Sequence, residues 1–312
     1  MPKKIKLLNI DEVKRGVEQL LKDESWTLLK AEENPNDFIN RFNKIFGKHL
    51  KYIPYLIKLL EIKDKPFKFY RIRRVNEKFN ADLISTHGSP TSDVSLHFQR
   101  ANIPNFPVFY GSENPGTAIY ELLQQKQVNK KDDFVLSEWT FRKNSKIRIC
   151  PFIFSESTIN WIQGYTSNLI DEIKNQVLVG FSKDEKEGFI EALRFLSKLF
   201  IEERSKPITS FLAHANLYAN HLKRAEVFIY PSVQTERKSV NFAIHPNCIH
   251  HKAILKNLYK IKLGKLDYDK GTYQIAVLSA GENKEGIIHW YTVDKNGNSE
   301  HSGLKEMIKR TR

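Results

Sequence analysis

The residues of this sequence best suited to chemistry are Tyr110 and Glu121, an aromatic hydroxyl and a carboxylate on adjoining structural elements. Both lie in the segment RANIPNFPVFYGSENPGTAIYE, residues 100–121. At roughly 100° per helical residue, Glu121 falls about 60° from Ala118, at the border of an apolar helical stripe. A carboxylate at such a border can line a cleft. From these two residues alone, the favoured interpretation is a strand-end core tyrosine and a surface glutamate.

Local signals predict a strand, a turn and a helix that position this pair. The apolar run Pro107–Tyr110 has strand composition, and glycine, serine, asparagine and proline follow it as turn and helix-start signals. Asn114 is suited to the N-cap, and Pro115 suits the first helical position, where a missing N–H costs nothing. We expect the helix to continue to about Gln127.

Several other chemistries lack their motifs. The sequence contains no GxxxxGK[ST] phosphate loop, no GxGxxG dinucleotide fingerprint, no GxSxG nucleophile elbow and no HExxH zinc helix. A weak candidate for metal binding is the segment HPNCIHH, with His245, Cys248, His250 and His251. It lacks a second ligand pair at zinc-site spacing, so we expect a loop after a strand and no metal.

The whole chain has the composition of a globular protein and a positive net charge that favours binding of anions. It has 312 residues, 40% of them hydrophobic, and a formal net charge of +14, which favours phosphate-bearing partners or acidic proteins. The basic residues are scattered, so a dedicated nucleic-acid arm is not evident, although nucleic acid is not excluded. The only cysteines, Cys150 and Cys248, are far apart in sequence, which is typical of a reducing cytoplasm. We expect no signal peptide and no membrane-spanning segment.

The pattern along the chain predicts helices first and a β-containing domain next. Three segments up to residue 62 have apolar spacing near 3.6: IDEVKRGVEQLLKD, NPNDFINRFNKIFGK and HLKYIPYLIKLLEIK. After Pro66 the period changes to that of a strand, on which Arg71 and Arg73 share one face. Residues 76–99 indicate a long loop of the kind that is often functional.

The second half predicts further strands and helices. FVLSEWTFRK and KIRICPF resemble paired strands, and NLIDEIKNQVLV, EKEGFIEALRFLSKLFIEE and ITSFLAHANLYANHLKR have helical patterns. EVFIYPS and SVNFAIHP indicate short strands, and the last residues indicate a small β-meander. We therefore expect a helical N-terminal segment (1–65), a central domain (66–255) and a β-rich extension (256–312).

Three blocks together resemble the RES domain, a family named for its arginine, glutamate and serine. The blocks are FYRIRR, RANIPNFPVFYGSENPGTAIYE and VFIYPSVQTERKSVNFAIHP, in the family's order, and the resemblance covers roughly Phe67 to Pro246. It matches the family's arginine to Arg71 and its tyrosine to Tyr110. It matches the glutamate to Glu121 and the serine to Ser232.

The resemblance implies an α+β fold like that of ADP-ribosyltransferases, with a mixed, split β-sheet and flanking helices. It also implies NAD as substrate, with no separate cofactor. Glu121 would stabilise the positive charge that develops at the anomeric carbon as nicotinamide leaves. Arg71, with Arg73 on the same face, would clamp phosphate, Tyr110 would stack on or orient the nicotinamide ring, and Ser232 would donate to phosphate or ribose. Arg100 and Asn102 match the family's RFN-type turn.

RES proteins are typically NAD-consuming bacterial toxins silenced by a cognate antitoxin, so the resemblance implies an NAD glycohydrolase or phosphorylase with an antitoxin partner. The acceptor for the ribosyl group stays open, because water, phosphate and a macromolecule all follow the same bond cleavage. Transfer to a protein or nucleic acid is therefore an alternative. A second alternative is a non-catalytic basic module that binds nucleic acid or an acidic partner. A homo-oligomer is also possible from the sequence.

Overall fold

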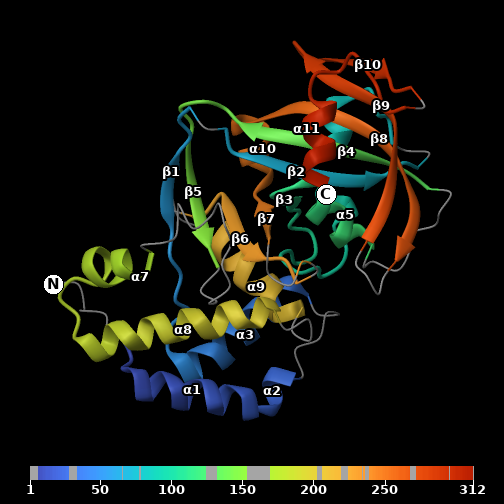
Figure 1. The fold of residues 1–312 in the computed structure, drawn as a ribbon. Coiled ribbons are helices and arrows are strands. Elements are labelled where there is room, and N and C mark those ends of the chain that lie inside the picture. Colours follow the sequence, from blue (N-terminus) through green and yellow to red (C-terminus); the bar gives the residue numbers. More distant parts are fainter. Residues whose placement is uncertain are drawn as a thin grey trace. The chain divides into compact units, whose positions relative to one another are not determined.

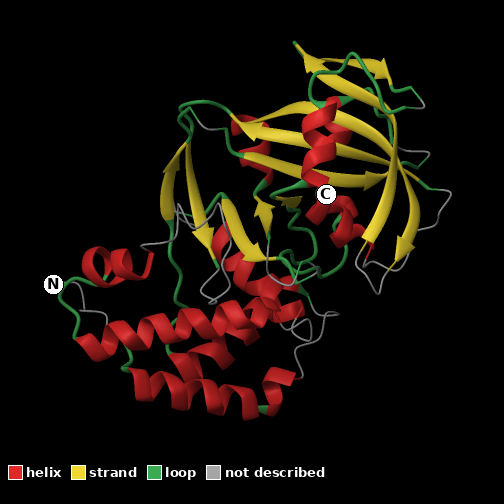
Figure 2. Ribbon diagram, viewed as in Figure 1, coloured by secondary structure: helices red, strands yellow, loops and turns green. Residues whose placement is uncertain are grey.

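The chain is an α+β protein whose described residues form ten strands, with helices before, between and after them. The computed structural model describes residues 6–27, 34–64, 66–76, 79–123, 132–152, 169–201, 206–218, 224–233, 235, 239–267, 272–294 and 296–311. The α+β class predicted from the sequence is confirmed, and the strands pair in both parallel and antiparallel fashion (Figures 1 and 2). The chain divides into two compact units, each made of three separate segments.

The first unit comprises Met1–Lys58, Thr91–Pro107 and Arg148–Pro231. Its helices are α1 (Ile10–Lys22), α2 (Glu24–Thr27), α3 (Pro35–Leu50), η1 (Ser92–Val94), α7 (Leu169–Glu172), η2 (Ile173–Val177), α8 (Lys183–Ile201) and α9 (Lys206–Leu217). Strand β6 (Val227–Pro231) pairs in parallel with β5 (Lys146–Pro151). Stacked phenylalanines join α3 to α9, since the rings of Phe42 and Phe211 lie 3.8 Å apart. An aromatic core therefore holds this helical unit together.

The second unit comprises Leu59–Pro90, Val108–Ile147 and Ser232–Arg312. Its seven-stranded antiparallel array runs β7-β3-β2-β4-β8-β9-β10. These strands are β2 (Lys68–Arg74), β3 (Phe109–Ser112), β4 (Asp133–Phe141), β7 (Val240–Ile244), β8 (Ala253–Asp267), β9 (Thr272–Lys284) and β10 (Ile287–Thr292). The helices are α4 (Ile84–His87), α5 (Pro115–Leu123), α10 (Pro246–Lys252) and α11 (Leu304–Thr311).

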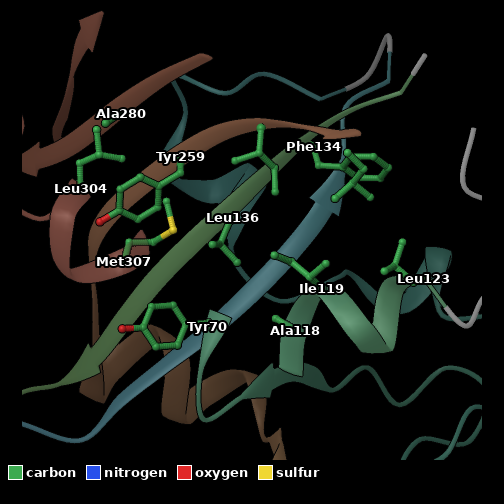
Figure 3. Close-up of a cluster of buried hydrophobic side chains, with 12 residues drawn as sticks. Tyr70, Ala118, Ile119, Leu123, Phe134, Leu136, Tyr259, Ala280, Leu304 and Met307 are labelled. Atoms are coloured by element: carbon green, nitrogen blue, oxygen red, sulfur yellow. The ribbon is translucent and has the colours of Figure 1, made fainter. Parts of the chain in front are cut away.

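One buried cluster packs α5 and α11 against a face of this array. Figure 3 shows Tyr70 from β2, Ala118 and Ile119 from α5, and Leu304 and Met307 from α11 within that cluster. Ala118 and Ile119 belong to the apolar stripe predicted for α5. The packing therefore fixes the rotation of α5 about its axis, and with it the direction of its polar side.

The pairing between β2 and β3 is limited to a single register pair, Tyr70 with Ser112. On its other edge β2 pairs with β4 from Lys68 to Arg74, and β3 pairs on its other edge with β7 from Phe109 to Ser112. Residues 70–74 and 109–112 therefore lie on neighbouring strands in the middle of the array.

One predicted helix and one predicted strand pairing are wrong. The segment HLKYIPYLIKLLEIK does not form a helix: α3 ends at Leu50, and β1 spans Lys58–Glu61. Lys51 has a φ of 59°, a left-handed conformation that ends the helix, and Pro54 disfavours a new one because it lacks an N–H. Strands β4 and β5 exist as expected but do not pair with each other, because β4 lies between β2 and β8.

Candidate functional site

The segment that carries Tyr110 and Glu121 folds as its local signals predict. Strand β3 spans Phe109–Ser112 and helix α5 begins at Pro115. The side chain of Asn114 accepts a hydrogen bond from the backbone N–H of Thr117 at 2.8 Å, so Asn114 is the N-cap. The predicted end of the helix near Gln127 lies outside the described residues, which stop at Leu123 in this helix.

Glu121 is held through one carboxylate oxygen by two donors. Its Oε1 accepts from Ser232 Oγ at 2.8 Å and from Asn241 Nδ2 at 2.5 Å. Ser232 is fully buried, and it lies 111 residues from Glu121 in sequence. Among the residues that the structure describes, Glu121 Oε2 accepts no hydrogen bond. Glu121 is itself only half-buried, so one oxygen is anchored while the other is left for a ligand.

Asn241 was not identified from the sequence, although it completes this arrangement. It belongs to β7, whose other residues are apolar and buried, and its side chain is 3% exposed. The hydroxyl of Ser112 donates to Asn241 Oδ1 at 2.8 Å. A polar residue in the middle of an apolar strand is the signal that could have found it, since a buried amide needs partners.

Arg71 and Arg73 point to the face of β2 opposite to the packed Tyr70, because alternate residues of a strand face opposite sides. Arg71 Nη1 donates to Gly88 O at 2.9 Å, and its guanidinium lies 4.6 Å from the ring centre of Phe109. Arg73 Nη1 donates to the carbonyl of Thr86. The residues around α4 thus supply neutral carbonyl acceptors to both guanidinium groups.

Neither arginine has a carboxylate partner in the described part of the chain. The pKa of Arg71 is lowered to about 9, mainly by burial and also by the charge of Arg73, while Tyr110 acts in the opposite direction. Burial also lowers the pKa of Arg73. Both groups remain cations at neutral pH, so two partly buried positive charges lie side by side without a counter-charge. This arrangement favours an anionic ligand such as a phosphate group.

Strand β3 connects these two parts of the site. The ring of Phe109 lies against Arg71, Tyr110 raises the pKa of the same guanidinium, and the hydroxyl of Ser112 orients Asn241. The structure thus brings Ser232 to Glu121 and Tyr110 to Arg71. No hydrogen bond or ion pair joins Arg71 to Glu121 among the described residues.

The predicted residues Arg100 and Asn102 belong to the first unit, in a turn closed by the bond from Gln99 N to Asn102 O at 3.1 Å. Asn102 is buried, and its Nδ2 donates to Ser95 Oγ and to the carbonyl of His97, both at 3.1 Å. The amide of Asn102 therefore ties its own loop together.

The HPNCIHH segment forms the start of α10 and not a loop. His245 is the N-cap, its Nδ1 accepting from Asn247 N at 3.2 Å, and Cys248 is a buried free thiol. The rings of His250 and His251 contact each other edge to face. Across the described ranges, no three His, Cys, Asp or Glu side chains gather as a metal ion would require.

Comparison with known proteins adds no relative. No family model matches the chain, and no curated protein matches it. Within the described residues, none of the helices combines the length and apolar character needed to cross a membrane.

Proposed function

We propose that this protein cleaves the bond between nicotinamide and ribose in NAD. The observation that carries the proposal is the carboxylate of Glu121, anchored through Oε1 by Ser232 and Asn241, while none of the described residues donates to Oε2. The resemblance of three sequence blocks to the RES domain supports the same conclusion. So does the single pair between β2 and β3, which suits the split sheet of an ADP-ribosyltransferase-like fold.

Cleavage of the nicotinamide–ribose bond requires only one carboxylate. Nicotinamide leaves a pyridinium cation as a neutral molecule, so its departure needs no general acid, unlike that of most sugar leaving groups. Positive charge then develops at the anomeric carbon and the ring oxygen. The negative charge of Glu121 stabilises the transition state more than the ground state, because that positive charge grows along the reaction. Its fixed orientation avoids reorganisation at the moment of reaction.

The two arginines bind the other end of the substrate. The planar guanidinium of Arg71 can direct parallel N–H bonds to pyrophosphate oxygens, and Arg73 adds a second charge on the same face. Tyr110, which raises the pKa of Arg71, lies on the strand between the arginines and the Glu121 network and orients the nicotinamide riboside. Ser232 acts through Glu121, since its hydroxyl is already donated to that carboxylate.

The proposed setting is a bacterial toxin in the cytoplasm, with a cognate antitoxin that blocks the site. Both cysteines are free thiols, as a reducing compartment would leave them. The acceptor that attacks the ribosyl carbon is water in a glycohydrolase, inorganic phosphate in a phosphorylase, or a macromolecule in an ADP-ribosyltransferase.

Nicotinamide release tests the proposal. Purified protein is incubated with NAD, with and without inorganic phosphate, and nicotinamide and the ribosyl product are separated by chromatography. We expect release from the wild type and a loss of roughly 100- to 1,000-fold in Glu121→Gln, the size typical of removing one electrostatic stabiliser. The mass of the ribosyl product identifies the acceptor.

A binding module is the second candidate, because the net charge of +14 and the two arginines Arg71 and Arg73, which have no carboxylate partner among the described residues, suit polyanions as well as NAD. Intact NAD under all acceptor conditions, together with DNA retention that falls steeply with salt, would favour it over the enzyme.

A further inference from the structure

A buried hydrogen-bond chain runs from strand β3 through strand β7 to the carboxylate of Glu121. Ser112 and Asn241 face each other in the register of β3 and β7, and Ser112 Oγ donates to Asn241 Oδ1 at 2.8 Å. Asn241 Nδ2 then donates to Glu121 Oε1 at 2.5 Å. Ser112 and Asn241 are 4% and 3% exposed, so water does not compete for these bonds. We infer that Asn241, oriented by Ser112, is a positioning residue for Glu121; this inference rests on the proposed function.

The direction of each bond specifies the orientation of the Asn241 amide. A side-chain amide has a donor end and an acceptor end, and the hydroxyl of Ser112 occupies the acceptor end of Asn241. The NH₂ group is therefore turned toward Glu121. Ser232 also donates to the same oxygen. Two donors from separate parts of the chain therefore converge on the same oxygen of Glu121.

The same contacts fix the position of the second oxygen. A glutamate has three side-chain torsions, and a carboxylate with no partner rotates freely about the last of them. Two bonds to Oε1, from separate elements, restrict that rotation and hold Oε2 in one place. Misplacement of a catalytic group by about 1 Å can cost on the order of 100-fold in rate. Loss of Asn241 should therefore lower kcat more than it raises KM.

A purely structural role for Asn241 would give a different result, and Ser239 provides a matched control for that alternative. Ser239 precedes Asn241 in the same segment and is equally buried, at 3% exposed. Its Oγ accepts hydrogen bonds from Thr117 Oγ1 at 2.6 Å and from Asn114 Nδ2 at 3.2 Å. These two bonds join the start of β7 to the beginning of α5, one helical turn before Glu121. Ser239→Ala thus removes similar bonds between the same two elements without touching Glu121.

The experiment compares kcat, KM and melting temperature for Asn241→Ala, Ser112→Ala and Ser239→Ala, with nicotinamide release from NAD as the assay. We expect Asn241→Ala to lower kcat by roughly 10- to 100-fold with KM within about threefold. Ser112→Ala should lower kcat less, because it removes only the group that orients the amide. Ser239→Ala should lower the melting temperature and keep kcat within roughly twofold. Equal losses of kcat in Asn241→Ala and Ser239→Ala, or none in Asn241→Ala, would overturn the inference.

Asn241→Asp tests the contact through the pH dependence of the reaction rate, which a purely structural role would leave unchanged. It places a second carboxylate within hydrogen-bond distance of Glu121, and two such groups resist being ionised together. The acid limb of the pH–rate profile should move to higher pH by roughly one unit or more. An unchanged profile in a folded, active variant contradicts the inference.

Failure of the proposed function is recognised separately. If the wild type releases no nicotinamide, the enzyme proposal fails, and the network is tested without substrate by carbon NMR of labelled glutamate side chains. Glu121→Gln identifies the Glu121 signal by its absence. A higher titration midpoint for that signal in Asn241→Asp than in the wild type supports the contact, and identical midpoints refute it.

Discussion

Replacement of Arg71 by lysine separates phosphate binding from general positive charge. In the structure the guanidinium donates one N–H to Gly88 O at 2.9 Å and lies 4.6 Å from the ring centre of Phe109. Of its five N–H donors, four remain for a ligand, arranged in a planar fork. Lysine keeps the charge but loses the fork and much of the aromatic contact. Arg71→Lys should therefore weaken NAD binding while leaving the carboxylate chemistry intact.

The size of the effect follows from the contacts that are lost. One charged hydrogen bond to pyrophosphate contributes about 1.5–3 kcal/mol, and an exposed cation–π contact about 0.5–1 kcal/mol. Lysine recovers part of both, so we take a net loss of about 2 kcal/mol, which is roughly 30-fold in KM at about 1.4 kcal/mol per tenfold. The value of kcat should stay within about threefold, because the phosphate contact is the same in ground and transition states.

Arg74→Lys is the matched control for this experiment. Arg74 lies on the same strand, but its side chain is 49% exposed and paired with Asp132 at 2.6 Å. The Arg74→Lys substitution should change kcat and KM by no more than roughly twofold relative to the wild type, since exposed ion pairs contribute little. The measurement is the NAD dependence of nicotinamide release at constant ionic strength. A KM for Arg71→Lys close to that of the wild type, or equal effects of the two substitutions, would refute the assignment of Arg71 to phosphate.

Two further predictions concern stability. Burial lowers the pKa of His214 to about 4, below the unfolded value near 6.5, so its stabilising contribution is lost as pH falls between these values. We expect the free energy of unfolding, measured with urea, to fall between pH 7 and pH 4 by up to about 3 kcal/mol more in the wild type than in His214→Phe. Equal decreases in the two proteins would contradict this. Glu138, with a side chain 6% exposed, is paired with Lys68 at 3.0 Å and accepts from Asn257 at 3.0 Å. Lys68 also contacts Glu306, at 3.2 Å. Glu138→Ala should lower the unfolding free energy by about 3 kcal/mol, and a loss under about 1 kcal/mol would contradict the assignment of a stabilising role to Glu138.

The parts of the site that are local in sequence could be predicted, and those set by strand register could not. Asn114, Pro115 and the apolar stripe of α5 were identified because capping and helical periodicity act within a few residues. Asn241 was missed because its role depends on facing Ser112 across two strands. Ser232 was identified only through the family resemblance, and its contact with Glu121 required the folded chain.

The error at residues 49–63 has the same origin. The apolar spacing there suits a helix, but it does not outweigh a backbone that turns left-handed at Lys51 and a proline at position 54. The segment forms β1 instead, and β1 lies next to β5. Periodicity predicts which side of an element is apolar. The choice between helix and strand was made here by backbone restrictions and by pairing with a distant strand.

The charges of the site argue against a purely structural role for its arginines. Partly buried guanidinium groups are costly unless a carboxylate or another anion compensates them, and like charges on one face add to that cost. Arg74 shows the usual solution on the same strand, with Asp132 as its partner. Arg71 and Arg73 have only backbone carbonyls and aromatic rings in the described part of the chain. A scaffold would gain by pairing or replacing them, whereas a site that receives a pyrophosphate needs them uncompensated until the ligand arrives. The carboxylate of Glu121 has the complementary arrangement, because Ser232 and Asn241 both donate to Oε1 and no described residue donates to Oε2; the proposed reaction would place its developing positive charge beside this group.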